Sequence, residues 1–206
     1  SFITELATRG NLTQTTRIVV DLYGSLSLTG KGHATDVAII MGLAGNSPQD
    51  VDIDAIPAFI QRVTESGRLP VAKGSRQVDF PLPESIVFHD SALARHENGM
   101  RISAWDHQQP LLSKTYYSIG GGFIVEEACF GQTHDVATPV PFDFRSAHQL
   151  LQLCEHNGLS ISGLMMQNEL ALRDKGQIEA GFAAIYAVMH NGIERGMNTE
   201  GVLPGP

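Results

Sequence analysis

Glycines, hydroxyl groups, a lysine and a histidine gather in the stretch YGSLSLTGKGHATD, residues 23–36, between two apolar segments. Such a composition could bind phosphate. A phosphate-binding loop of the Walker type, however, has four residues between its first glycine and the Gly-Lys pair, and a Ser or Thr after the lysine. Here five residues separate Gly24 from Gly30 and Lys31, and Gly32 follows the lysine. The spacing therefore argues against a nucleotide-phosphate loop.

His33 offers a different chemistry. It lies just before a predicted helix, between two small residues, with Lys31 two positions earlier. A cation close to a histidine favours the neutral imidazole, and the neutral imidazole is the form that a general base requires. His33 is therefore a candidate for proton transfer.

Two further loops hold residues that could take part in chemistry, His-Glu-Asn-Gly at 96–99 and Ser-Ile-Gly-Gly-Gly at 118–122. The triple glycine follows a predicted strand and offers consecutive backbone N–H groups that a carboxylate could approach closely. A bulge or a tight turn between two strands would have the same sequence. His96 is equally compatible with an ordinary surface histidine, so sequence alone leaves both interpretations open.

The pattern of histidines and cysteines does not predict a metal site on this chain. His89 and His96 are seven positions apart on different predicted elements, and no His-Glu-x-x-His motif occurs. Cys129 and Cys154 are too far apart in sequence to suggest a Cys-x-x-Cys site, and we expect each to be a buried structural cysteine.

Composition limits the kinds of partner. The chain has 206 residues, 42% hydrophobic and 17% charged, which suits one or two globular domains. Its net charge of −8 argues against nucleic-acid binding, which needs clustered Lys and Arg. It has no apolar run of about 18 residues that could span a membrane. Two cysteines give no disulfide framework, so we expect a reducing cytoplasm.

Strands and helices mix in the first part of the chain. The β-rich runs TRIVVDLYG, RQVDF, SIVFHD, GMRISAW, LLSKTYYSI and GFIVEE predict strands. One helix is predicted from Thr35 to Gly45, and a second, capped by Asp54, ends at Gly67. One buried face is indicated where Met100, Ile102 and Ala104 alternate with Arg101, Ser103 and Trp105.

Residues 131–145 hold two prolines and little periodicity, which predicts a linker. The pattern beyond the linker is helical: Ser146 can cap AHQLLQLCEHNG, Ser160 or Ser162 can cap GLMMQNELALRDKG, and QIEAGFAAIYAVMHNGIERG forms a longer helix. We therefore predict an α+β fold class, with a mixed α/β domain at 1–130, a linker at 131–145 and a helical region at 146–206.

Five stretches in order, YGSLSLTGKGHATDVAIIMGLAGN, HENGM, SKTYYSIGGGF, GLMMQNELAL and GMNTEGVLPGP, resemble the iron–sulfur-dependent L-serine dehydratases of bacteria. The resemblance implies conversion of L-serine to pyruvate and ammonia with a [4Fe-4S] cluster and no pyridoxal phosphate. It also implies a first domain similar to the allosteric substrate-binding domain of phosphoglycerate dehydrogenase, followed by the first helices of an all-α catalytic domain. L-Serine would be the small-molecule partner, and we expect a homodimer.

The chain also departs from that family. The family's Ser-Ser-Ser-His-Thr motif lies upstream of the first residue, its cluster cysteines lie beyond Pro206, and neither Cys129 nor Cys154 matches a ligand position. Because a cluster with one open iron needs three thiolates, we expect a fragment without cofactor, inactive alone. The two-chain members of the family divide close to the predicted linker, so we expect a truncated single-chain enzyme.

The resemblance gives the candidate residues their roles. Dehydrating serine requires a base for the Cα proton and donors that hold the carboxylate. His33 is the candidate base, although His96 or the upstream histidine could replace it. The candidate carboxylate-binding residues are Lys31, Thr29, Ser118, Gly120, Gly121 and Gly122. The candidates that would line the rest of the substrate site are His96, Asn98, Asn198, Thr199 and Glu200. The alternative function is a regulatory amino-acid or anion-binding module without catalytic groups.

Overall fold

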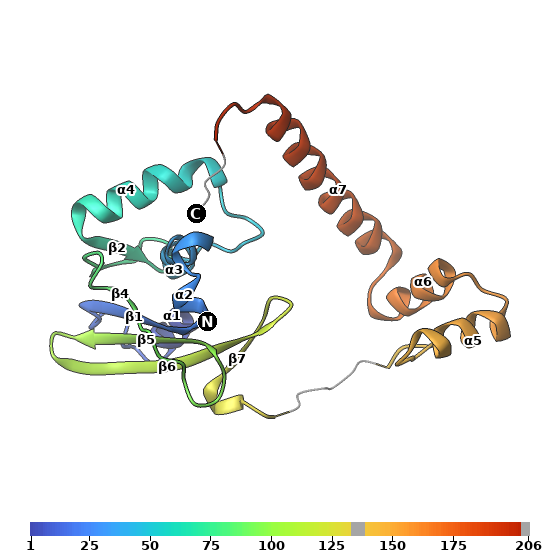
Figure 1. Cartoon of the computed structure of the whole chain (residues 1–206), viewed down its shortest axis with the longest axis horizontal. Helices are drawn as coiled ribbons and strands as arrows, with labels where there is room; N and C mark the ends of the chain where they lie inside the picture. The colour runs from blue at the N-terminus through green and yellow to red at the C-terminus, as the bar shows by residue number, and fades with distance from the viewer. Residues whose placement is uncertain (133–138, 203–206) are drawn as a thin grey trace. The chain divides into compact units, whose positions relative to one another are not determined.

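The structure, a computed structural model, describes residues 1–132 and 139–202 (Figure 1). These residues form two compact units, the first comprising Ser1–Gln132 and the second lying within 139–202. The first unit combines a mixed sheet with helices, and the described part of the second contains helices only, which confirms the α+β class. The similarity to phosphoglycerate dehydrogenase stays a prediction. The predicted linker includes 133–138, which lie outside the described residues.

The first unit is built on a seven-stranded sheet in the order β2-β3-β1-β5-β6-β7, with β4 also paired to β1. β1 runs parallel to β3 and β4 and antiparallel to β5. The strands are β1 (Arg17–Gly24), β2 (Arg68–Val71), β3 (Arg76–Asp79), β4 (Ile86–Phe88), β5 (Asn98–Asp106), β6 (Gln109–Gly120) and β7 (Phe123–Glu126). All six predicted strands are confirmed. The prediction missed β2, whose Pro70 is tolerated because β2 is an edge strand.

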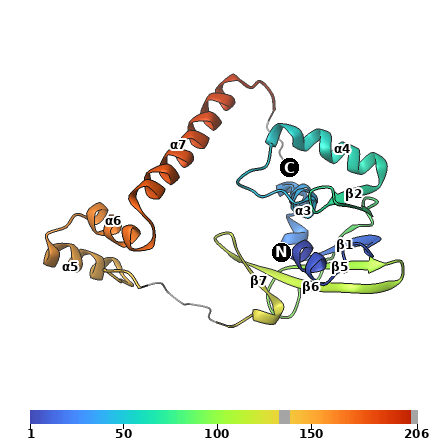
Figure 2. The ribbon, with the colours of Figure 1, turned by 180° about the vertical axis from the view of Figure 1, so that it is seen from behind.

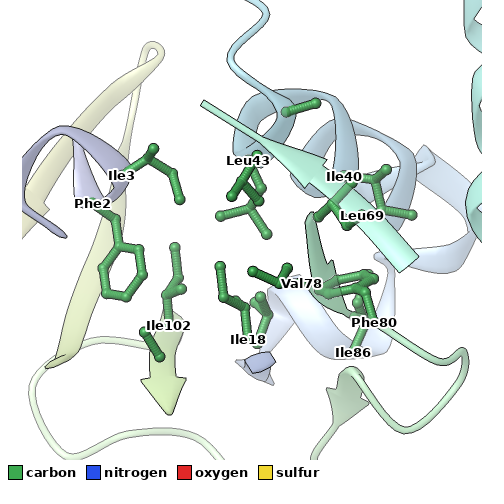
Figure 3. Packing of buried hydrophobic residues seen from close by; sticks show 14 of the residues in the cluster. Phe2, Ile3, Ile18, Ile40, Leu43, Leu69, Val78, Phe80, Ile86 and Ile102 are labelled. Carbon is green, nitrogen blue, oxygen red and sulfur yellow. The ribbon is translucent and has the colours of Figure 1, made fainter. Parts of the chain in front are cut away.

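Burial alternates along β1, as the two-residue period of a strand requires. Ile18, Val20 and Leu22 are fully buried, whereas Asp21 and Tyr23 point to the other face and are half-buried. The buried side chains pack with those of α1 (Phe2–Thr8), α3 (Thr35–Ala44) and α4 (Ile56–Ser66) in one core (Figure 3). Ile102 and Ala104 of β5 belong to the same core, which confirms the face predicted for that strand.

The helices α1 and α4 of the first unit differ from the prediction. α1 was missed; its Phe2, Ile3 and Leu6 enter the core, and Lys114 of β6 fixes it by an ion pair with Glu5. The predicted cap Asp54 is wrong. A 3-10 turn, η2 (Ile53–Ala55), precedes α4, and the Asp52 side chain accepts the Asp54 N–H at 3.0 Å. α4 begins later because Pro57, which has no N–H to lose, occupies its first turn.

The described part of the second unit contains α5 (Ala147–Asn157), α6 (Ile161–Leu172) and α7 (Lys175–Asn198). Ser146 caps α5 as predicted, and Ser160 rather than Ser162 caps α6. The buried Asn168 binds the backbone of Phe142, accepting its N–H at 2.9 Å and donating to its carbonyl at 2.8 Å. The C-terminal part of the predicted linker is therefore attached to α6. No helix among the described residues is long and apolar enough to cross a membrane.

Candidate active site

The pairing of the strands brings the three candidate loops to one end of the sheet. Gly24 at the end of β1 pairs with Asn98 at the start of β5. Gly99 pairs with Tyr117, one residue before Ser118, and Ser118 pairs with Ile124 of β7. Residues 25–33, 96–99 and 118–122 thus lie at neighbouring strand ends, although they are far apart in sequence.

Gly24 holds the first two loops together. The N–H of Gly24 donates to the Ser91 carbonyl at 2.9 Å, and the N–H of Ser25 donates to the Glu97 carbonyl at 3.2 Å. Gly24 has a φ of 56°, and a Cβ atom there would lie 2.0 Å from the Glu97 oxygen. Only glycine allows this approach without moving one loop. The sequence had offered Gly24 only as the possible first glycine of a phosphate loop.

The first loop consists of α2 (Ser25–Leu28) and a 3-10 turn, η1 (Lys31–His33). The exposed His33 places its Nδ1 atom 2.9 Å from the Thr29 carbonyl, which can only accept a hydrogen. Neutral His33 therefore carries its proton on Nδ1 and leaves the lone pair of Nε2 free, as a general base needs. The Thr29 hydroxyl donates to the Ser25 carbonyl at 2.8 Å, so its proton is used within the loop.

Lys31 extends from η1 over an aromatic ring. Its side chain is exposed, and its Nζ atom lies 5.2 Å from the centroid of the Phe88 ring. Within residues 1–132 and 139–202, no carboxylate forms an ion pair with Lys31. Its charge is thus available to an anionic ligand.

His96 differs from His33 in its tautomer. Its Nδ1 atom accepts the N–H of Asn98 at 3.0 Å, so neutral His96 carries its proton on Nε2 and is a donor there. The ring is half-buried and has its edge near Tyr117 and Phe130, at centroid distances of 6.3 and 6.4 Å. Burial raises the pKa of Tyr117, whose hydroxyl donates to Glu127 at 2.9 Å. This arrangement suits a residue that lines the substrate site better than it suits a general base.

The triple glycine forms the turn between β6 and β7. Gly120, Gly121 and Gly122 have φ values of 96°, 61° and 81°, a conformation that other residues rarely adopt. The turn lies at the projecting tip of the hairpin (Figure 2), next to the half-buried Ser118. The tight-turn interpretation of this loop is therefore correct, and its backbone N–H groups stay candidates for a carboxylate.

Three of the candidate residues belong to the second unit, at the end of α7. The Asn198 amide donates to the Glu194 carbonyl at 2.7 Å, and the Thr199 hydroxyl donates to the Arg195 carbonyl at 2.6 Å. Asn198, Thr199 and Glu200 are exposed. Their share in a substrate site stays a prediction.

Sequence reasoning missed a contact beside the site, between His89 and Asp21. The Nε2 atom of His89 lies 2.7 Å from Oδ1 of Asp21, and the imidazole is stacked on Tyr23 with a centroid distance of 4.5 Å. The two residues are 68 positions apart and meet because β4 pairs with β1. This pair fixes the start of the segment that leads to the second candidate loop.

The described residues contain no group of three or more His, Cys, Asp or Glu side chains that could hold a metal ion. Cys129 is half-buried in η3 (Glu127–Cys129), in the first unit. Cys154 is buried in α5, in the second unit.

Comparison with known proteins gives a consistent set of relatives. Residues 1–129 match the family described as serine dehydratase beta chain. The whole chain is 73% identical to L-serine dehydratase TdcG of Escherichia coli strain K12 and covers 45% of that protein. It is 56% identical to L-serine dehydratase 1 of the same organism and 47% identical to the L-serine dehydratase of Haemophilus influenzae. In each case the chain spans 45% of the relative's length.

Proposed function

Because the chain belongs to the serine dehydratase beta-chain family, we propose that the protein is an L-serine ammonia-lyase that converts L-serine to pyruvate and ammonia. The family match and the 73% identity to a protein named L-serine dehydratase support the substrate. The observation that carries the proposal is that the three candidate loops lie at neighbouring strand ends. The first of them holds the oriented His33 and Lys31, whose ammonium pairs with no carboxylate of the described residues.

The residues of this chain would bind the carboxylate of serine and remove its Cα proton. Lys31 and the N–H groups of residues 120–122 hold the carboxylate, and the negative charge that develops there strengthens these contacts. Nε2 of His33 takes the Cα proton. The Thr29 carbonyl, 2.9 Å from Nδ1, then stabilises the imidazolium, and His96 presents a donor from the neighbouring loop.

An iron–sulfur cluster is part of the family resemblance, but the residues of this chain do not fit one. A cluster with one open iron needs three thiolates. The chain has two cysteines, and they belong to different compact units. We therefore propose that the ligands of the cluster lie outside these residues.

The absence of clustered basic residues in a chain of net charge −8 supports a small-molecule partner rather than nucleic acid, and its two free thiols suit a reducing cytoplasm. The homodimer stays a prediction, which sedimentation of the complete protein would test.

Initial rates of pyruvate formation by the complete protein test the proposal. If His33 and Lys31 act on substrate, His33→Ala lowers kcat about 10²- to 10⁴-fold and Lys31→Met raises KM. The alternative, a regulatory amino-acid or anion-binding module, predicts a different result. Both variants would then keep kcat within about twofold of the parent and would change only the concentration dependence of activation.

A further inference from the structure

Phe88 lies beneath the first candidate loop. It is the last residue of β4 and pairs with Leu22 of β1, close to the end of the sheet where the candidate loops meet. The ring is half-buried and packs against the core, so its position is fixed by the sheet. The Nζ atom of Lys31 lies 5.2 Å from the centre of this ring, within the range of a cation–π contact.

Gly30 makes a second contact with the same ring. A Cβ atom at Gly30 would lie 3.2 Å from Cε1 of Phe88 and 2.2 Å from the Leu26 carbonyl oxygen. The backbone of the loop therefore comes close to the ring edge at the residue before Lys31. The ring of Phe88 therefore supports two successive residues: it lies against the backbone of Gly30 and beneath the ammonium group of Lys31.

The chemistry of this support matters for an anionic ligand. A carboxylate beside Lys31 would fix the side chain but would also neutralise its charge. An aromatic ring attracts the ammonium through its quadrupole and leaves the positive charge available. The ammonium of Lys31 contacts the Phe88 ring, and no carboxylate among the described residues forms an ion pair with it.

We infer that Phe88 is a positioning residue, whose ring holds the Lys31 ammonium in place for the carboxylate of the substrate. The inference rests on the proposed function, because it assigns Phe88 a role only through Lys31. A flexible lysine must be ordered when the substrate binds, and that ordering weakens binding. A ring that orders Lys31 in advance lowers KM more than it changes kcat.

The test compares the complete protein with Phe88→Leu, Phe88→Tyr, Lys31→Met and the double variant Phe88→Leu/Lys31→Met. Phe88→Leu should raise KM for L-serine about two- to fivefold, the effect of one exposed cation–π contact. Phe88→Tyr keeps the ring and should keep the parental KM. In the Lys31→Met background, Phe88→Leu should change KM no further, because the group that the ring positions is gone.

Phe59→Leu is the matched control. Phe59 of α4 is also half-buried against the core and also lies under a cation, with the Arg62 guanidinium 5.7 Å from its centroid. It lies outside the candidate loops and should leave KM unchanged. A loss of ring-current shift of the Lys31 methylene protons in Phe88→Leu would report the contact itself, independently of turnover.

Three results would overturn the inference: an equal rise in KM from Phe88→Leu with and without Lys31, an unchanged KM in Phe88→Leu, or an unchanged KM in Lys31→Met. These results leave the proposed reaction standing wherever the parent forms pyruvate, although an unchanged KM in Lys31→Met also removes the carboxylate-binding role of Lys31. A complete protein that forms no pyruvate from L-serine overturns the proposed function, and the inference with it.

Discussion

Replacing His33 by asparagine separates its chemistry from its structural contact. The amide nitrogen of asparagine stands at the same number of bonds from Cβ as Nδ1 of histidine. It can therefore keep the hydrogen bond to the Thr29 carbonyl, which is 2.9 Å long in the structure. Asparagine has no basic nitrogen in the place of Nε2. His33→Asn thus removes the proposed base and retains the loop.

The expected changes in kcat and in the free energy of unfolding follow from the role and the exposure of the His33 side chain. Removing a general base lowers kcat about 10²- to 10⁴-fold. Because His33 is exposed, His33→Asn should change the free energy of unfolding by less than about 0.5 kcal/mol. His33→Ala also loses the hydrogen bond to Thr29 and should cost about 0.5–1.5 kcal/mol, with a similar loss of kcat.

Pyruvate formation at saturating L-serine and a thermal melt of the complete protein measure both quantities. His107→Asn is the control, because the side chain of His107 is 85% exposed in the turn between β5 and β6, whereas the candidate loops meet at the start of β5 and the end of β6. Its kcat should equal that of the parent. If His33→Asn keeps more than about a tenth of the parental kcat, His33 is not the general base, since removal of a general base lowers kcat by about 10²-fold or more.

Three further substitutions test contacts that stabilise the fold. Gly24→Ala should lower the free energy of unfolding by more than about 1–2 kcal/mol, measured by urea denaturation, because φ is 56° and the new Cβ would meet a carbonyl oxygen; an unchanged midpoint would contradict this. The ion pair with Lys114 holds the pKa of Glu5 below 4.5, and its carboxylate partners raise the pKa of Lys114 to about 12. The parent should therefore lose this stability as pH falls below 4.5 or rises above 10.5. Melting curves of Lys114→Met should lack the loss at high pH and show a smaller loss at low pH, because Arg9 still pairs with Glu5 and lowers its pKa. Asn168→Ala should leave the N–H of Phe142 without its partner and speed its hydrogen exchange, whereas unchanged exchange would show that the bond does not protect it.

Local signals in the sequence predicted much of the fold. The β-branched residues of β1 and the alternation in β5 predicted both strands, and Ser146 and Gly45 marked helix ends that the structure has at the same residues. The errors arose where a local signal had a competitor. Asp54 is a good capping residue by type, but Pro57 determines where α4 begins. The strand β2 was missed because it contains a proline.

The site was less predictable than the fold, since its contacts are non-local. Each candidate loop could be recognised by composition, but their meeting depends on the register between β1, β5 and β6. Phe88 carries no polar group, so nothing in its own stretch suggested a role. Its place under Lys31 follows from the parallel pairing of β4 with β1, which no short motif encodes.

The two candidate histidines differ in which nitrogen carries the proton, and this difference can be measured directly. Nδ1 of His33 faces a carbonyl that only accepts, whereas Nδ1 of His96 faces the N–H of Asn98, which only donates. Neutral His33 must therefore be the Nδ1–H tautomer, and neutral His96 the Nε2–H tautomer. Nitrogen-15 chemical shifts of the ring atoms above pH 8 distinguish the two forms, since a protonated ring nitrogen resonates far from an unprotonated one. His33→Asn and a His96→Asn variant assign the signals. If His33 shows the Nε2–H tautomer, its lone pair points into its own loop and cannot reach a substrate proton. The base would then have to lie elsewhere, and the orientation argued for this loop would be wrong.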